Sequence, residues 1–324
     1  MTKIQAKPPK VSILIPVYNR KDYIAECIQS ALNQTCTDFE VVVVDNASND
    51  GTWEICRQIA ASDHRVRIFQ NGTNIGPVRN WLACVDKAQG VFGKILFSDD
   101  LMFPQFLEHT LPYLECPDVG FVSTAALIGT GVENGTLHYS LANATERLHS
   151  ERYFELLLTA SAPFSPGAAI FRMADIRANL RLSFPTCIPR DFTKNGAGPD
   201  VLLYALTALN YKAVVMLPMA EVFFRVHTDS FTIANDDNEV TKGYLAALAW
   251  FFKTQLTQNH WASYIARTWL SKVRSAGRLS SLTKYCAEYE GKDSLIEAAI
   301  VLIAAARIAI AELLNRANKT IRQR

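Results

Sequence analysis

The 324-residue sequence lacks any pair of cysteines spaced as in a zinc ribbon or a dithiol redox motif. Its seven cysteines lie far apart, at Cys27, Cys36, Cys56, Cys84, Cys116, Cys187 and Cys286. An odd number without a C-x-x-C arrangement excludes the common cysteine-based metal and redox sites, and it predicts reduced, mostly buried thiols. The first residues also lack the apolar segment of a secretory signal. We therefore expect a cytoplasmic protein.

An excess of charge of one sign is also missing. The 33 Lys and Arg residues against 31 Asp and Glu residues give a formal net charge of +2. Nucleic-acid binders usually carry a concentrated basic face, so this balance predicts no nucleic-acid partner. Basic residues do gather at both ends of the sequence, at Lys3, Lys7, Lys10, Arg316, Lys319, Arg322 and Arg324. Solvated termini explain such clusters in most proteins.

Two further absences narrow the function. No uninterrupted apolar run is long enough to span a bilayer. No G-x-x-x-x-G-K or G-x-G-x-x-G loop follows the first apolar run. Both loops hold phosphate groups with backbone amides, so their absence argues against an ATPase and against a dehydrogenase. A nucleotide site in this sequence must bind its phosphates in another way.

What is present is an alternation of apolar runs and amphipathic stretches. The runs VSILIPV (residues 11–17) and FEVVVV (39–44) are typical of strands covered on both faces. Further strands are predicted at residues 66–69 and 94–97. Helices are predicted at residues 20–34, capped by Asn19, at 52–61, at 77–88, and after Pro104. This order predicts an α/β fold with a doubly wound, mostly parallel sheet.

Beyond residue 119 the pattern is mixed. Strands are predicted at residues 120–128, 167–171, 213–217 and 222–226, and helices near 151–159 and 201–209. From about residue 239 the sequence is rich in Ala and Leu and has no strand signal. We therefore expect a basic tail (1–10), an α/β domain (11–238) whose halves meet near residue 118, and a C-terminal helical region (239–324).

Polar residues follow three of the predicted strands. Tyr18, Asn19 and Arg20 follow the first, Asp45 and Asn46 the second, and Asp99 and Asp100 the fourth. Ligands of open α/β sheets bind beyond the carboxyl ends of strands, where these segments converge. Adjacent carboxylates there suit a divalent cation that also binds phosphate oxygens. A carboxylate in this position is also a common turn or cap residue, and that reading stays open for any one of them.

The segments VSILIPVYNR, VVVVDNASNDGT and ILFSDDLMFP resemble, in order and spacing, the nucleotide site of glycosyltransferase family 2. The resemblance covers residues 11–114 and extends more loosely to residue 227. It implies an A-type glycosyltransferase fold with a nucleotide-binding half (about 11–118) and an acceptor half (about 119–238). It also implies an inverting glycosyltransferase that takes a sugar from a nucleoside diphosphate sugar, UDP-linked by default.

The resemblance also assigns roles to single residues. It places Pro16, Tyr18 and Arg20 beside the nucleobase and diphosphate, and Asp45 on the base or ribose. Ser98 and Asp99 fall in the aspartate-x-aspartate region, where many relatives have an aspartate in place of Phe97. This implies Mn²⁺ or Mg²⁺ on Asp99, with Asp100 as the second candidate ligand.

Three later segments complete the expected site. Asn74 and Arg79 lie in a loop that resembles the family's asparagine-x-glycine segment, and Arg79 is expected at the diphosphate. Asp200 stands where the family carries its catalytic carboxylate, although a first-turn acid at a helix start is equally common in proteins. His227 resembles a late histidine near the diphosphate or metal, and a merely hydrogen-bonded histidine is the alternative.

The resemblance further implies a glycan or glycolipid acceptor in cell-surface polysaccharide assembly. Three other functions are weighed against it. A glycoside hydrolase needs no divalent metal or nucleobase contact. A sugar-nucleotide nucleotidyltransferase usually has a glycine-rich loop that PVYNR does not resemble. A noncatalytic interaction protein would bind neither nucleotide nor metal.

The stretch LIEAAIVLIAAARIAIAELL (residues 295–314) is strongly apolar but contains Glu297, Arg307 and Glu312, which argue against a membrane span. Apolar residues lie around much of this predicted helix. Packing against the catalytic domain or against another subunit of a homo-oligomer explains that pattern. Attachment to the inner face of the plasma membrane, aided by the basic residues that follow, is the alternative.

Overall fold

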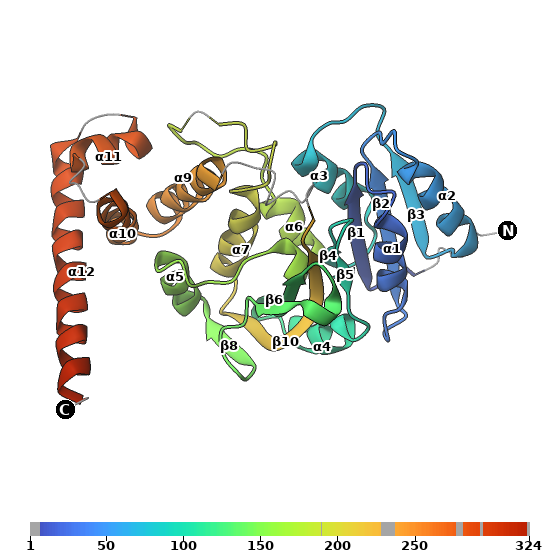
Figure 1. The fold of residues 1–324 in the computed structure, drawn as a ribbon, viewed down its shortest axis with the longest axis horizontal. Coiled ribbons are helices and arrows are strands. Elements are labelled where there is room, and N and C mark those ends of the chain that lie inside the picture. Colours follow the sequence, from blue (N-terminus) through green and yellow to red (C-terminus); the bar gives the residue numbers. More distant parts are fainter. Residues whose placement is uncertain (1–6, 189, 228–236, 277–280, 292–293, 323–324) are drawn as a thin grey trace.

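The structure is a computed structural model that describes residues 7–188, 190–227, 237–276, 281–291 and 294–322. Its centre is a ten-stranded sheet with the path order β3-β2-β1-β4-β9-β6-β10-β5, to which β7 and β8 add at β6 and β10 (Figure 1). The strands are β1 (Val11–Val17), β2 (Phe39–Asp45), β3 (Val66–Gln70), β4 (Phe92–Ile95), β5 (Leu101–Met102), β6 (Val119–Gly129), β7 (Thr136–His138), β8 (Glu146–His149), β9 (Ala169–Arg172) and β10 (Ala213–Arg225).

Most of the long strands run in one direction. Strands β3, β2, β1 and β4 pair in parallel, and so do β6 and β10. Strand β9 lies between the two groups and is antiparallel to both β4 and β6, so the two groups share one direction. The prediction of a mostly parallel α/β sheet is confirmed. The carboxyl ends of six strands therefore meet at one rim.

Helices cover both faces of this sheet (Figure 1). They are α1 (Ile24–Leu32), α2 (Thr52–Ser62), α3 (Pro77–Lys87), α4 (Phe106–Leu114), α5 (Ser150–Leu158), α6 (Met173–Asn179), α7 (Pro199–Leu209), α9 (Asp237–Gln255), α10 (Gln258–Ala276), α11 (Leu282–Glu290) and α12 (Leu295–Arg322). Short 3-10 turns lie at Val132–Asn134 and Pro166–Ala168. Each face of the sheet has a core of its own.

The alternation of strand side chains explains these two cores. Ile13 and Ile15 of β1 pack in the cluster with α1, α2 and α4, whereas Leu14 packs in the cluster with α3, α5, α7 and α9. Neighbouring side chains of a strand point to opposite faces, so a strand covered on both faces needs apolar side chains at most positions. This requirement accounts for the continuous runs VSILIPV and FEVVVV.

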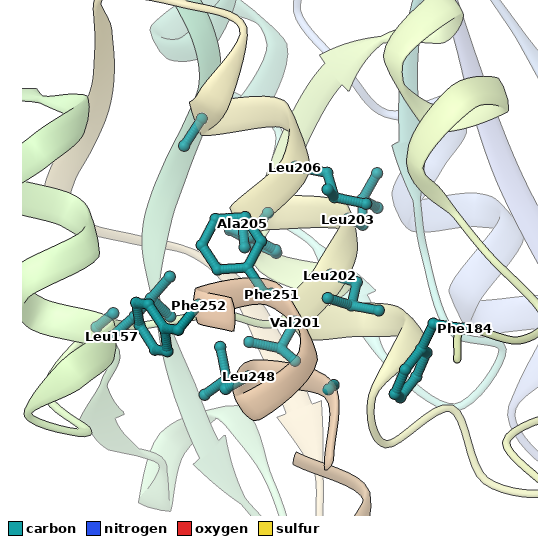
Figure 2. Close-up of a cluster of buried hydrophobic side chains, with 14 of the residues drawn as sticks. Leu157, Phe184, Val201, Leu202, Leu203, Ala205, Leu206, Leu248, Phe251 and Phe252 are labelled. Atoms are coloured by element: carbon teal, nitrogen blue, oxygen red, sulfur yellow. The ribbon is translucent and has the colours of Figure 1, made fainter. Parts of the chain in front are cut away.

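The C-terminal helices extend the second core. Helix α9 packs against α7, α10 packs against α9 and α5, and α12 packs against α10 and α11. Figure 2 shows the centre of this core, where Val201 and Leu202 of α7 meet Leu248 and Phe251 of α9. Helix α12 is the outermost layer (Figure 1). Within the described residues, no helix combines the length and the hydrophobicity that a membrane crossing requires.

Several predicted boundaries were wrong. Helix α1 begins at Ile24 rather than at residue 20, and Asn19 does not cap it. Asn19 instead has a φ of +49° and accepts a hydrogen bond from the Asn49 amide at 3.0 Å, because it belongs to the turn at the rim. The strands predicted at 213–217 and 222–226 are one strand, β10, with register shifts on either side of Ala220. Pro218 interrupts the sequence pattern but not the strand.

Candidate active site

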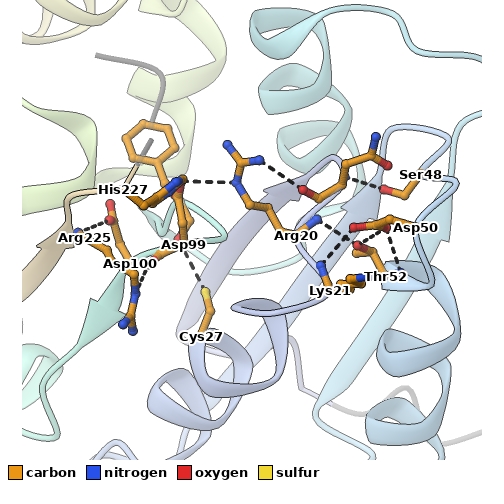
Figure 3. Close-up of polar contacts among 12 residues, drawn as sticks. Arg20, Lys21, Cys27, Ser48, Asp50, Thr52, Asp99, Asp100, Arg225 and His227 are labelled. Atoms are coloured by element: carbon orange, nitrogen blue, oxygen red, sulfur yellow. Dashed lines mark hydrogen bonds and ion pairs between the residues drawn. The ribbon is translucent and has the colours of Figure 1, made fainter. Parts of the chain in front are cut away.

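The rim of the sheet brings together segments that lie far apart in the sequence. The Asp99 carboxylate follows β4, and its Oδ2 accepts a hydrogen bond from Arg20 Nε at 3.2 Å (Figure 3). The same oxygen lies 3.0 Å from Nε2 of His227, which follows β10. The His227 ring stacks on the Tyr23 ring, with the ring centroids 4.8 Å apart. Arg20, Asp99 and His227, which the sequence singled out separately, therefore form one contact group.

Asp100 lies beside this group and is buried. Its Oδ1 accepts the backbone N–H of Arg225 at 3.0 Å, while Nε of the same arginine donates to the Asp99 carbonyl at 3.1 Å (Figure 3). Arg225 also reaches Glu26 of α1, with 2.6 Å between Nη2 and Oε2. Burial, followed by the negative charge of Asp99, raises the pKa of Asp100 well above its usual range. Two adjacent carboxyl groups thus stand on the rim among three cationic or ionisable side chains.

A buried lysine lies beneath these aspartates. Lys94 of β4 has no exposed surface, and its ammonium group donates to the carbonyl oxygens of Ile95, at 2.9 Å, and of Gly167. Burial lowers the pKa of Lys94 to about 7, and the charge of Asp100 opposes that shift. The sequence pattern did not single out Lys94, because a single lysine in an apolar strand is typical of an exposed edge strand.

Asp200 lies in the first turn of α7 and is held by three donors. Its Oδ1 accepts the backbone N–H groups of Gly198, at 3.0 Å, and of Val201, at 2.7 Å. Its Oδ2 accepts the Tyr244 hydroxyl of α9 at 2.8 Å. Burial raises the pKa of Asp200 to about 6, and the hydrogen bonds from Tyr244 and the backbone limit the rise. Asp200 therefore caps its helix and is also a carboxyl group that changes charge near neutral pH.

Three residues around Asp200 escaped the sequence analysis. Tyr244 looks like any apolar position of a helix. Tyr139, which has a φ of +62°, lies close enough to both site carboxyl groups that, after burial, the charges of Asp200 and Asp100 raise its pKa. Arg190 has a side chain that is only 5% exposed, and its Nη1 lies 3.7 Å from Glu239. None of the three belongs to a motif, so only the fold reveals them.

The predicted nucleobase residues differ in accessibility. Tyr18 leaves 41% of its surface in water, whereas Pro16 is buried inside β1. Asp45 has no exposed surface, and its carboxylate accepts hydrogen bonds from the Ser48 amide and hydroxyl and from Gln70. For the predicted contact between Asp45 and a base or ribose, a hydrogen bond from Ser48 or Gln70 therefore has to break. Ser98 is also mostly buried.

The loop before α3 is held by asparagines. Asn74 Oδ1 accepts the side-chain N–H of Asn46 at 2.8 Å and the backbone N–H of Gly76 at 2.9 Å. Arg79 extends from α3 and donates to the Thr193 hydroxyl at 2.9 Å, so it joins α3 to the segment that precedes α7. Its predicted contact with a diphosphate stays a prediction.

The fit of a metal ion can be judged from these donors. In the part of the chain that the structure describes, no group of three or more His, Cys, Asp and Glu side chains converges as a preformed metal site. Asp99 and His227 supply an oxygen and a nitrogen of suitable chemistry, and Asp100 adds a second carboxyl group next to them. A metal ion at Asp99 would replace the Asp99–His227 contact with two metal–ligand bonds.

Comparison with known proteins shows which proteins this chain resembles. The profile of "Glycosyl transferase family 2" matches residues 12–178. The putative glycosyltransferase EpsH of Bacillus subtilis is 30% identical over 180 residues, which are 55% of this chain and 51% of EpsH. A chondroitin synthase of Escherichia coli is 43% identical over 101 residues, which are 31% of this chain and 14% of that protein. The chain thus spans about half or less of the curated relatives it matches.

Solved structures share the fold. The crystal structure of S. aureus TarS 1-349 in complex with UDP-GlcNAc superimposes with a TM-score of 0.64 at 20% sequence identity. The match covers 91% of this chain and 79% of the TarS chain. At this identity the likeness concerns the fold alone. The match extends beyond the residues that the family profile covers.

Proposed function

Because the chain belongs to glycosyl transferase family 2, and is therefore a glycosyltransferase, we propose that it transfers a sugar with inversion from a nucleoside diphosphate sugar to a hydroxyl group. The proposed donor is UDP-linked, and the proposed acceptor is a glycan or glycolipid in cell-surface polysaccharide assembly. Similarity to a chondroitin synthase supports the acceptor class. We place the enzyme in the cytoplasm, in keeping with its seven free cysteines.

The arrangement of Asp200 carries this proposal. With a pKa of about 6, its carboxylate is mostly ionised at neutral pH and can accept the proton of an acceptor hydroxyl. Tyr244 and two backbone amides fix its orientation. As the hydroxyl oxygen attacks the anomeric carbon, the bond to the diphosphate breaks on the opposite side. One such displacement inverts the anomeric configuration.

The group around Asp99 serves the departing diphosphate. Arg20 and Arg225 lie at the rim and offset negative charge on phosphate oxygens. A bound Mn²⁺ or Mg²⁺ would add charge stabilisation for the leaving group. Asp99, Asp100 and His227 are the residues proposed to hold it. Without a glycine-rich phosphate loop, this cationic rim is the proposed diphosphate site.

A donor screen tests the proposal. Thermal shift with UDP, dTDP and GDP sugars, with and without Mn²⁺, should reveal a ligand that stabilises the folded chain. Incubation of that donor with oligosaccharide or lipid-linked acceptors should then release the nucleoside diphosphate. Formation of a nucleoside triphosphate and a sugar 1-phosphate when pyrophosphate is added to that donor would instead indicate a nucleotidyltransferase. If no sugar nucleotide stabilised the protein, with or without the metal, the proposal would fail.

A further inference from the structure

Helix α12 has two apolar faces, and the structure covers only one of them. The inner face, with Ala298, Val301 and Ala305, is buried in the second core. The outer face carries larger side chains that are 55–80% exposed, namely Leu295, Ile296, Leu302, Ile303, Ile310, Leu313 and Leu314. We call these seven residues the outer stripe. The bulkier half of the helix's apolar surface thus faces away from the protein.

The outer stripe is unusual within this molecule. Among the described residues, the other exposed large hydrophobic side chains are scattered over the α/β domain, such as Val91 and Leu137. Single exposed hydrophobic residues are normal, whereas a continuous patch of several hundred Å² marks an interaction site. At 1.5 Å per residue, the stripe runs about 29 Å along the helix. Figure 1 shows that α12 forms one end of the molecule, where no other element covers this face.

The spacing of the stripe indicates what covers it. Ile296, Ile303 and Ile310 are seven residues apart, and Ala299, Ala306 and Leu313 follow each of them by three. A seven-residue repeat of this kind keeps one seam of a helix against a partner helix. Isoleucine at the first position suits two-stranded pairing, and alanine at the second lets two backbones come close together. The pattern is that of a helix that pairs with another helix.

We propose that the outer stripe is the interface with a second copy of this chain, in which α12 pairs with α12 about a twofold axis. A twofold axis presents the same stripe from both sides, so one sequence supplies both halves of the seam. Burial of a Leu or Ile side chain removes on the order of 100 Å² of apolar surface. Seven of them approach the roughly 800 Å² per partner of a standard interface.

A membrane surface fits the described residues less well. Helices that lie in a bilayer interface combine an apolar face with aromatic residues and flanking Lys or Arg. Residues 295–315 contain no aromatic side chain, and Arg307 is their single basic residue. The acidic residues of this span are already paired inward, Glu297 with Lys253 and Glu312 with Arg274. The structure does not describe the side chains of the basic residues at 316–324. The test therefore also measures binding to vesicles.

The test measures mass in solution. Sedimentation velocity of the full chain between about 1 and 100 µM should give roughly twice the 36.1 kDa monomer. The dimer should persist in 1 M NaCl, because apolar association is not screened by salt. Ile303→Glu places two carboxylates in the seam and should weaken dimerisation at least a hundredfold. Ile303→Leu should keep the dimer.

Controls separate this interface from the alternatives. Val91→Glu, at an exposed apolar residue of the α/β domain, should leave the mass unchanged. If circular dichroism showed Ile303→Glu to be misfolded, Ile310→Glu would decide in its place. A wild-type monomer at 100 µM, or a dimer that survives both glutamate variants, would overturn the proposal. So would a wild-type monomer that co-sediments with phosphatidylglycerol vesicles and loses this binding in Ile303→Glu.

Discussion

Asp100 is buried and Asp200 is partly buried, and both carboxyl groups have raised pKa values, but their surroundings differ. Asp100 has another carboxylate next to it in the chain, whose charge adds to the effect of burial on its pKa, and it accepts one backbone hydrogen bond. Asp200 has three hydrogen-bond donors, and burial is the main cause of its raised pKa. The first environment favours cations, and the second favours proton transfer near neutral pH. We therefore propose different tasks for the two aspartates, cation binding beside Asp99 and proton transfer at Asp200.

We expect the largest effect from a substitution at the proposed cation-binding residues. Asp99→Ala removes the carboxylate that both Arg20 and His227 contact. We expect transfer to fall below detection and donor binding to lose its dependence on Mn²⁺, because the diphosphate loses its bridge to the protein. Isothermal titration with and without the metal measures this. Glu26→Gln, which only weakens a contact of Arg225, is the matched control, and full wild-type activity in EDTA would contradict the assignment.

We expect the second-largest effect from a substitution of the proposed base, Asp200. Asp200→Asn keeps the shape but removes the base, so transfer should fall about 10²- to 10⁴-fold while the donor Kd changes little. Release of nucleoside diphosphate and donor titration measure the two quantities. Asp191→Asn is the control, since this exposed aspartate bonds the neighbouring Thr193. If Asp191→Asn were the inactive variant and Asp200→Asn the active one, the assignment of the base would be reversed.

A smaller effect sharpens the comparison through pH. Wild-type kcat should decline as the pH drops below about 6, because Asp200 becomes protonated. The hydrogen bond from Tyr244 lowers the pKa of Asp200, so Tyr244→Phe should raise that pKa and move the acid limb of the profile to higher pH. Tyr289→Phe removes a hydroxyl that donates a hydrogen bond to the Tyr285 hydroxyl, and this variant should not change the pH profile. An unmoved limb in Tyr244→Phe would argue that another group sets it.

The smallest effect concerns the link between α3 and the segment before α7. If Arg79 contacts the diphosphate, Arg79→Gln should raise the donor KM by roughly three- to tenfold, the range of one lost hydrogen bond of ordinary strength. Thr193→Val removes the hydrogen bond that Arg79 makes in the structure and keeps the guanidinium. Equal KM values for the two variants would show that Arg79 acts only by holding Thr193.

The donor half of the site was easier to predict than the acceptor half, for a physical reason. Arg20 and Asp99 each follow a buried strand, and parallel strands bring such residues to one rim regardless of loop detail. Tyr244 and Tyr139 reach Asp200 only because α9 and the segment after β7 pack over it, and packing leaves no mark at a single position. The sequence does not reveal that Ser48 and Gln70 already donate hydrogen bonds to Asp45. Its contact with a base or ribose stays a prediction.

The ion pair between Arg225 and Glu26 joins residues that are 199 positions apart in the sequence. The contact between His227 and Asp99 joins residues that are 128 positions apart. A ribosome that adds about 5–20 residues per second needs roughly 6–25 s to travel from Asp99 to His227. During that interval Arg20 and Lys94 have already been synthesised, whereas Arg225 and His227, the other partners of the two aspartates, have not. The contacts of these two residues with the rim therefore form late in translation, after β1 to β4 have been synthesised.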